Sequence, residues 1–188
     1  MLHSPEWKQG DTAQQRWAEK MRARGLCVLP TYAFEDVTKE TKAPVMLIPD
    51  RVLVTPDMLT LGRKAVEPVV WHEVKSKSAP TWHRNKERWE HGFDYDLVSE
   101  YDTVQTESMC PVWIIVQELS TPSDPSTESA LVAAEVWLYA RLATCIEYGE
   151  HREDWPGGRF KPWSRGRKGR GGLLWPRSIM KQLPTVTA

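Results

Sequence analysis

Residues 69 to 77 read VVWHEVKSK, an apolar run that continues without a break into alternating charges. Such a run predicts a buried β-strand. Side chains alternate between the two faces of a strand, so Glu73 and Lys75 project together with Trp71, and Val74 points the opposite way. On an exposed strand, Glu73 and Lys75 would form a surface ion pair worth less than about 1 kcal/mol. On a buried strand, they would form a candidate chemical site.

Segments typical of helices and of strands alternate along the rest of the chain. A first helix is predicted over residues 11–24, with Asp11 as its N-cap and Gly25 as its end, and a second over residues 94–107. Strands are expected in LCVLPTY, in the two apolar runs on either side of PDR, and in PVWIIVQEL. Residues 131–148 fit either a helix or a strand. This order predicts an α/β protein.

Composition favours one packed domain that covers residues 1–188. The chain is 40% hydrophobic and holds ten tryptophans, and no apolar run approaches the roughly 20 residues needed to span a bilayer. The N-terminus lacks the pattern of a signal peptide, so a cytoplasmic protein is expected, in a host cell if the gene belongs to a phage. Three widely spaced cysteines predict reduced thiols rather than disulfides or a zinc site. Because 25 basic and 25 acidic residues balance, any attraction to nucleic acid must be local.

An acid from a neighbouring strand would complete a metal site beside Glu73. Magnesium prefers oxygen ligands from carboxylates, water and phosphate. Asp50 in IPD and Asp57 in TPD are the two candidates. If MLTL and VVWHEVK pair as an antiparallel hairpin, Asp57 lies across from His72 and Glu73. Asp50 falls in a turn-like PDR setting, so Asp57 is the preferred ligand and Asp50 the alternative.

The pattern Pro56-Asp57, fifteen intervening residues, then Glu73-Val74-Lys75 resembles the active site of the PD-(D/E)xK nuclease superfamily. The order of elements over residues 11–118 is also similar to that of Holliday-junction-resolvase-like and phage-encoded members. The resemblance implies a restriction-endonuclease-like core, in which helices flank a central mixed β-sheet.

The same resemblance implies a magnesium- or manganese-dependent deoxyribonuclease of recombination, repair or phage replication, with branched DNA as one candidate substrate. Asp57, Glu73 and the Val74 carbonyl would hold the metal, and Lys75 would orient or deprotonate the attacking water. Resolution of a DNA junction would require two active sites, hence a homodimer.

The sequence departs from the resolvase pattern in the first helix. Resolvases carry a glutamate there, where this chain has Gln14 and Gln15, and Glu19 is expected to be solvated. A second metal is therefore in question. Tyr101 and Gln105 are candidate polar residues on the second helix. The alternative function is a DNA-binding or assembly protein that keeps the fold without catalysis.

Two segments carry the residues expected to contact DNA. Cationic and aromatic side chains suit contacts to phosphates and stacking on bases, whereas the alternative is a solvated loop. The segment that follows the catalytic lysine supplies Lys77, Trp82 and Arg84. A basic loop at residues 159–170 supplies Arg165, Arg167 and Lys168, and the alternative there is disorder.

Overall fold

A computed structural model of the chain describes residues 5–30, 45–48, 51–62, 69–152 and 171–184. Its helices and 3₁₀ turns are α1 (Pro5–Ala23), η2 (Arg84–Lys86), α2 (Tyr95–Ser108), α3 (Leu142–Tyr148) and η3 (Arg177–Ile179). Its strands are β1 (Cys27–Pro30), β2 (Val45–Ile48), β3 (Arg51–Val54), β4 (Met58–Leu61), β5 (Val70–Lys77), β6 (Thr81–His83), β7 (Arg88–Asp94), β8 (Val112–Pro122), β9 (Leu131–Arg141), β10 (Glu150–Arg152), β11 (Gly172–Pro176) and β12 (Lys181–Gln182).

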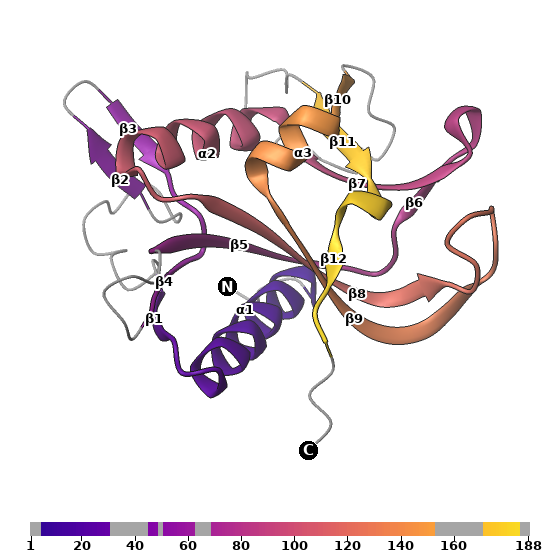
Figure 1. Ribbon diagram of the computed structural model, residues 1–188, viewed down its shortest axis with the longest axis horizontal. Coiled ribbons are helices and arrows are strands. Elements are labelled where there is room, and N and C mark those ends of the chain that lie inside the picture. Colours follow the sequence, from indigo (N-terminus) through magenta and orange to yellow (C-terminus); the bar gives the residue numbers. More distant parts are fainter. Residues whose placement is uncertain (1–4, 31–44, 49–50, 63–68, 153–170, 185–188) are drawn as a thin grey trace.

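A six-stranded mixed sheet forms the centre of the molecule, in the order β1-β4-β5-β8-β9-β12. Strands β5 and β8 are parallel, and the other neighbouring pairs in this sheet are antiparallel. Helix α1 crosses one face of the sheet, whereas α2 and α3 lie on the other (Figure 1). The prediction of an α/β protein with a central mixed sheet flanked by helices is confirmed.

Two apolar cores lie on the two faces of this sheet. The alternation of side chains along β8 sends Ile114 and Val116 toward α2 and α3, and sends Ile115 toward α1. On β5, Val74 packs in the α1 core with Trp17, as the alternation predicted. Glu73 and Lys75 therefore face the side that carries α2.

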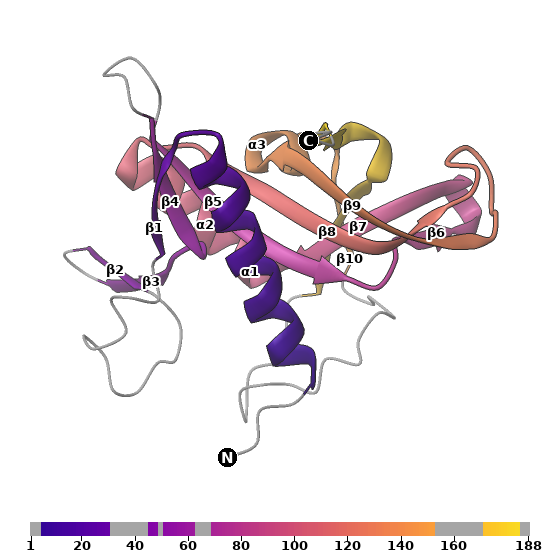
Figure 2. The same cartoon turned by 90° about the horizontal axis from the view of Figure 1, so that it is seen from below.

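A second sheet, in the order β10-β11-β7-β6, was missed by the sequence patterns. The charged segment after β5 was expected to be a DNA-facing surface, but it folds into the antiparallel hairpin β6–β7 (Figure 2). Its strand β7 buries Phe93, which is 4% exposed and packs edge-on against Trp175, and also buries the polar side chains of Glu90 and His91. This sheet covers part of the face on which Glu73 and Lys75 lie, because the Lys75 ammonium is 5.9 Å from the centre of the Phe93 ring.

Helix α1 begins at Pro5, so Asp11 lies inside the helix and the prediction of Asp11 as N-cap was wrong. Gly10 lies inside the helix, which tolerates glycine at a cost of about 1 kcal/mol, and Pro5 suits a first turn because it lacks an N–H. The predicted end is correct: Gly25 has φ 85°, and the Leu26 N–H donates to the Met21 carbonyl.

One open prediction is also resolved. Residues 131–148 form a strand followed by a helix, β9 and α3, and not one element. Within the described ranges, no helix is long and apolar enough to cross a bilayer.

Candidate active site at the open end of strand β5

The hairpin of β4 and β5 brings Asp57 to Glu73. The strands pair antiparallel with Met58 opposite His72, so Asp57, one residue before β4, lies at the position opposite Glu73. Strand β4 does not extend to this position, and the Asp57 side chain hydrogen-bonds to β5 in place of a strand backbone. Its Oδ2 accepts a hydrogen bond of 2.7 Å from the Val74 N–H. The predicted hairpin and its register are therefore present.

The Val74 carbonyl faces the same edge of β5. The N–H and C=O of one strand residue point to the same side, and the Val74 N–H points to Asp57. Two carboxylates and one backbone carbonyl thus meet where β5 continues beyond the start of β4. These are the three oxygen sources that the resemblance assigned to a metal.

Glu73 and Lys75 are not a surface pair. The Glu73 side chain is 1% exposed and forms an ion pair with the Lys75 ammonium, whose side chain is 35% exposed. Tyr101 of α2 lies beside the same carboxylate and is 2% exposed. The Lys75 ammonium and the Tyr101 hydroxyl both donate to this carboxylate. The Glu73 carboxylate is therefore shielded from water, and one ammonium balances both its charge and that of Asp57.

The charges shift one another's pKa values. Burial and then the Glu73 charge raise the pKa of Asp57 to about 7, although Lys75, the Val74 N–H and Gln14 oppose the shift. Burial alone would lower the pKa of Lys75, but the Glu73 and Asp57 carboxylates outweigh it and raise that pKa above its ordinary value. Lys75 is consequently a cation, and one ammonium faces two carboxylates.

Helix α1 contributes Gln14 to the site. The Gln14 Nε2 group donates a hydrogen bond of 2.8 Å to Asp57 Oδ1, so both Asp57 oxygens are held. Gln15 and Glu19 are exposed. The sequence interpretation treated Gln14 only as a missing glutamate. Its position on the same helical face as Trp17 and Ala13 would have placed it against the sheet.

The two candidates on α2 differ. Burial, followed by the negative charges of Glu73 and Asp57, raises the pKa of Tyr101 well above its usual range, so its hydroxyl stays protonated. Gln105 turns away: its Nε2 donates to Asp102 Oδ1 at 2.7 Å, and its Oε1 accepts from the Val112 N–H at 3.4 Å. Tyr101 therefore borders the site and Gln105 does not.

His72 is packed on the opposite face, as expected from the alternation. The Trp17 Nε1–H donates to its Nδ1 at 2.9 Å, so the ring proton is assigned to Nε2, which lies 2.9 Å from Thr60 Oγ1. Burial lowers the pKa of His72 to about 4. The ring is neutral at ordinary pH and supports the strand that carries Glu73.

The residues expected to contact DNA differ in their surroundings. Lys77 lines a small cavity, Trp82 packs edge-on against Trp89, and Arg84 is exposed beside Glu128 at 3.6 Å. The other residues expected to contact DNA lie outside the described residues: Arg165, Arg167 and Lys168. The alternative metal ligand Asp50 also lies outside them.

A divalent cation suits the donor set. The described ranges hold no group of three or more His, Cys, Asp and Glu side chains that could bind a metal. The site instead combines two carboxylates with the Val74 carbonyl, and hard cations such as Mg²⁺ accept such oxygens together with water. Two buried carboxylates that share one ammonium leave a surplus of negative charge, which fits a cation better than a closed protein site.

Comparisons with known proteins give matches to solved structures. No family model and no curated protein matches the sequence. Among solved structures, the chain is similar to the Holliday junction resolvase Hjc of Archaeoglobus fulgidus, with a TM-score of 0.46 and 10% sequence identity. The alignment covers 90% of this chain and 85% of the resolvase chain.

Proposed function

We propose that the protein is a magnesium- or manganese-dependent deoxyribonuclease of the PD-(D/E)xK superfamily, with a restriction-endonuclease-like core. The observation that carries the proposal is the meeting of Asp57 and Glu73 at the open end of β5, next to the Lys75 ammonium. A role in recombination, repair or phage replication, with branched DNA as one substrate, follows from the resemblance of the motif. Cleavage at both sides of a junction would need a homodimer.

The residues divide into ligands and positioning groups. Asp57, Glu73 and the Val74 carbonyl would hold the cation. When bound, it supplies polarisation of a phosphoryl oxygen and lowers the pKa of water toward neutrality. The Val74 N–H and the Gln14 amide fix both oxygens of Asp57, so its orientation is set before substrate arrives.

Lys75 provides positive charge at the reacting phosphate. With its pKa above the ordinary value, the ammonium is protonated, so it acts first as a donor that orients water and stabilises developing charge. A bound cation would compete for Glu73 and free the ammonium from its ion pair. Lys75 could deprotonate water only after this release, because the Glu73 and Asp57 carboxylates otherwise keep it protonated.

A catalytically inactive DNA-binding or assembly protein is the second candidate. Gln14 favours it, because a neutral amide touches Asp57 at the helix where resolvases carry a glutamate. The two candidates agree on DNA binding and differ on hydrolysis. The cleavage rate of a Lys75 variant separates them, because only a nuclease would lose activity when Lys75 is replaced.

Cleavage assays test the proposal directly. Purified protein is incubated with linear duplex, single-stranded and four-way-junction DNA in Mg²⁺, Mn²⁺ or EDTA. We expect metal-dependent cleavage, and a rate lower by about 10²- to 10⁴-fold for Lys75→Ala, because a positioned proton donor or acceptor contributes that much. Lys181→Ala, an exposed lysine on β12 at the far edge of the sheet, is the matched control and should cleave as wild type does. No cleavage of any substrate, or equal rates for Lys75→Ala and wild type, would contradict the proposal.

A further inference from the structure

Beyond Lys75, the same face of β5 carries a second lysine that lines a cavity. Lys77 lies two residues further along the strand, so the two Cα atoms are about 6.7 Å apart on one face. The cavity has a volume of about 40 Å³, and Thr81, Glu90 and Gly92 contribute to its wall. That volume admits about three water-sized groups, which suits phosphate oxygens and is too small for a base.

The Lys77 ammonium lacks a compensating acid. No ion pair or hydrogen bond to it occurs within the part of the chain that the structure describes. Burial, followed by the positive charge of Lys75, lowers the pKa of Lys77. An unpaired, partly buried ammonium costs free energy unless an anion offsets it.

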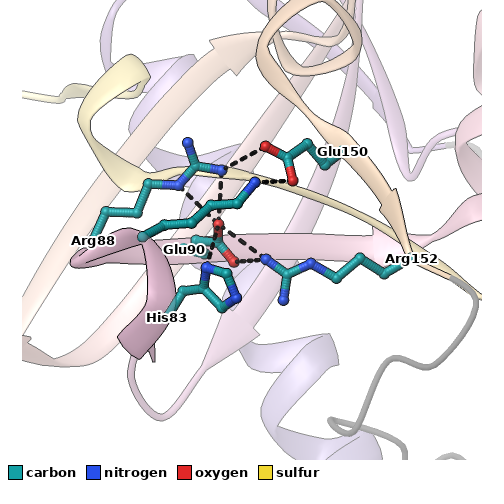
Figure 3. Close-up of polar contacts among 6 residues, drawn as sticks. His83, Arg88, Glu90, Glu150 and Arg152 are labelled. Carbon is teal, nitrogen blue, oxygen red and sulfur yellow. Dashed lines mark hydrogen bonds and ion pairs between the residues drawn. The ribbon is translucent and has the colours of Figure 1, made fainter.

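Glu90 does not supply that anion, because two arginines already engage it (Figure 3). Its side chain is 1% exposed, and its oxygens accept from Arg88 Nε at 2.8 Å and from Arg152 Nη2 at 3.0 Å. Glu150 engages Arg88 at 3.4 Å and also Lys86. Three cations, Lys86, Arg88 and Arg152, thus contact the two carboxylates of Glu90 and Glu150. This group has a net charge of +1, and Lys77 is not part of it.

Glu118, the register partner of Lys77 on β8, is also engaged elsewhere. Its oxygens accept from Arg177 Nε at 2.7 Å and Nη2 at 2.8 Å, and one lies 2.7 Å from His91 Nε2. Burial lowers the pKa of His91, so this ring adds no charge to the cavity wall at neutral pH. Glu90, Glu118 and Glu150 are therefore each engaged by other cations, and none of them pairs with Lys77.

We infer that the cavity beside Lys77 receives a second phosphate group of the bound DNA strand, next to the phosphate that is cleaved. Lys77 would contact its oxygens and the Thr81 hydroxyl would donate to them, while Arg88 and Arg152 balance Glu90, the carboxylate in the cavity wall. The inference rests on the proposed nuclease function and adds a positioning site to it. A strand held at Lys77 would present a fixed phosphodiester bond to Lys75 and the two carboxylates.

DNA binding in EDTA tests this site without cleavage. The affinity of the full chain for fluorescein-labelled duplex and single-stranded DNA is measured by anisotropy over a series of salt concentrations. For Lys77→Gln we expect a several-fold weaker affinity and a salt slope smaller by about 0.9 for duplex or 0.7 for single strands, the loss of one phosphate contact. Lys181→Gln removes the same charge from the exposed β12 and should bind as wild type does.

One further variant, thermal unfolding and a cleavage assay make the outcome decisive. Lys77→Arg should keep the wild-type slope, and Lys77→Gln should unfold at the same temperature as wild type or higher, because the removed charge is unpaired. An unchanged slope for Lys77→Gln, or an equal change for Lys181→Gln, would overturn the inference. If wild type cleaves DNA in Mg²⁺ in that case, the proposed function stands and the second phosphate site alone fails. If Lys77→Gln lowers the slope but wild type cleaves nothing, the site binds DNA and the nuclease proposal fails.

Discussion

Glu73 and Glu118 are both fully buried glutamates on neighbouring strands of the central sheet, yet their surroundings differ. Glu118 accepts two hydrogen bonds from the Arg177 guanidinium and one contact from His91. Glu73 has the Tyr101 hydroxyl and one cation, the Lys75 ammonium, which also balances the charge of Asp57. A buried carboxylate with all its partners in place supports the fold, whereas one left short of partners is available to a ligand.

The pKa values express the same contrast. Burial would raise the pKa of Glu118, but His91 and Arg177 outweigh it and lower that pKa. Burial and Glu73 raise the pKa of Asp57 to about 7. Glu90 resembles Glu118, since two guanidiniums hold it. The protein thus compensates two of its buried acids fully and leaves the pair at the end of β5 with excess negative charge.

The largest expected effect on stability is at Glu118. Glu118→Gln should lower the free energy of unfolding by about 3 kcal/mol, because it leaves the Arg177 guanidinium without its charge partner in a buried setting. Glu73→Gln should cost much less, since it removes a charge that the site does not balance. Urea unfolding in EDTA measures both, and equal losses in the two variants would remove the distinction between structural and ligand-binding glutamates.

A smaller effect, of opposite sign, is expected at Asp57. Its folded-state pKa of about 7 lies above the ordinary 3.8, so between these pH values the folded state binds more protons than the unfolded state. Metal-free stability therefore falls as pH rises from about 4 to 7. Asp57→Asn removes this loss, so the variant should be more stable than wild type at pH 7, by less than the roughly 4 kcal/mol to which the full pKa shift corresponds.

Thermal unfolding over pH 4 to 8 in EDTA measures that difference, which should grow with pH and level off above 7. Mn²⁺ should stabilise wild type and leave Asp57→Asn unchanged. Glu135→Gln, which removes an exposed acid paired with Arg16, provides the control and should follow the wild-type pH profile. A variant that is less stable than wild type at every pH would show that Asp57 is a structural acid like Glu118.

The part of the site that was predictable from sequence is local. Asp57 and Glu73 meet because a short antiparallel hairpin fixes their register, and alternation along one strand places Glu73 and Lys75 together. The ends of α2 and the strand character of β8 followed from periodicity and composition in the same way. Each depends on residues close in the chain.

The rest depends on contacts between distant segments. Arg177 reaches Glu118 across 59 residues and Arg152 reaches Glu90 across 62, so no local pattern distinguishes these glutamates from Glu73. The hairpin β6–β7 was missed because five consecutive residues of β7 are buried, the polar Glu90 and His91 among them, so the strand shows no alternation of apolar and polar residues. Gln14 was noted as an absent glutamate, and its contact with Asp57 needed the packing of α1 on the sheet.

Direct titration with Mn²⁺, followed by electron paramagnetic resonance of the free ion, tests the central claim most directly. Wild type should bind Mn²⁺, and Asp57→Asn and Glu73→Gln should each weaken binding by more than about tenfold, because each removes a ligand charge. Glu135→Gln should bind as wild type does. A wild-type protein that binds no Mn²⁺, or a Glu73→Gln variant that binds it as tightly as wild type, would contradict the assignment of the end of β5 as a cation site.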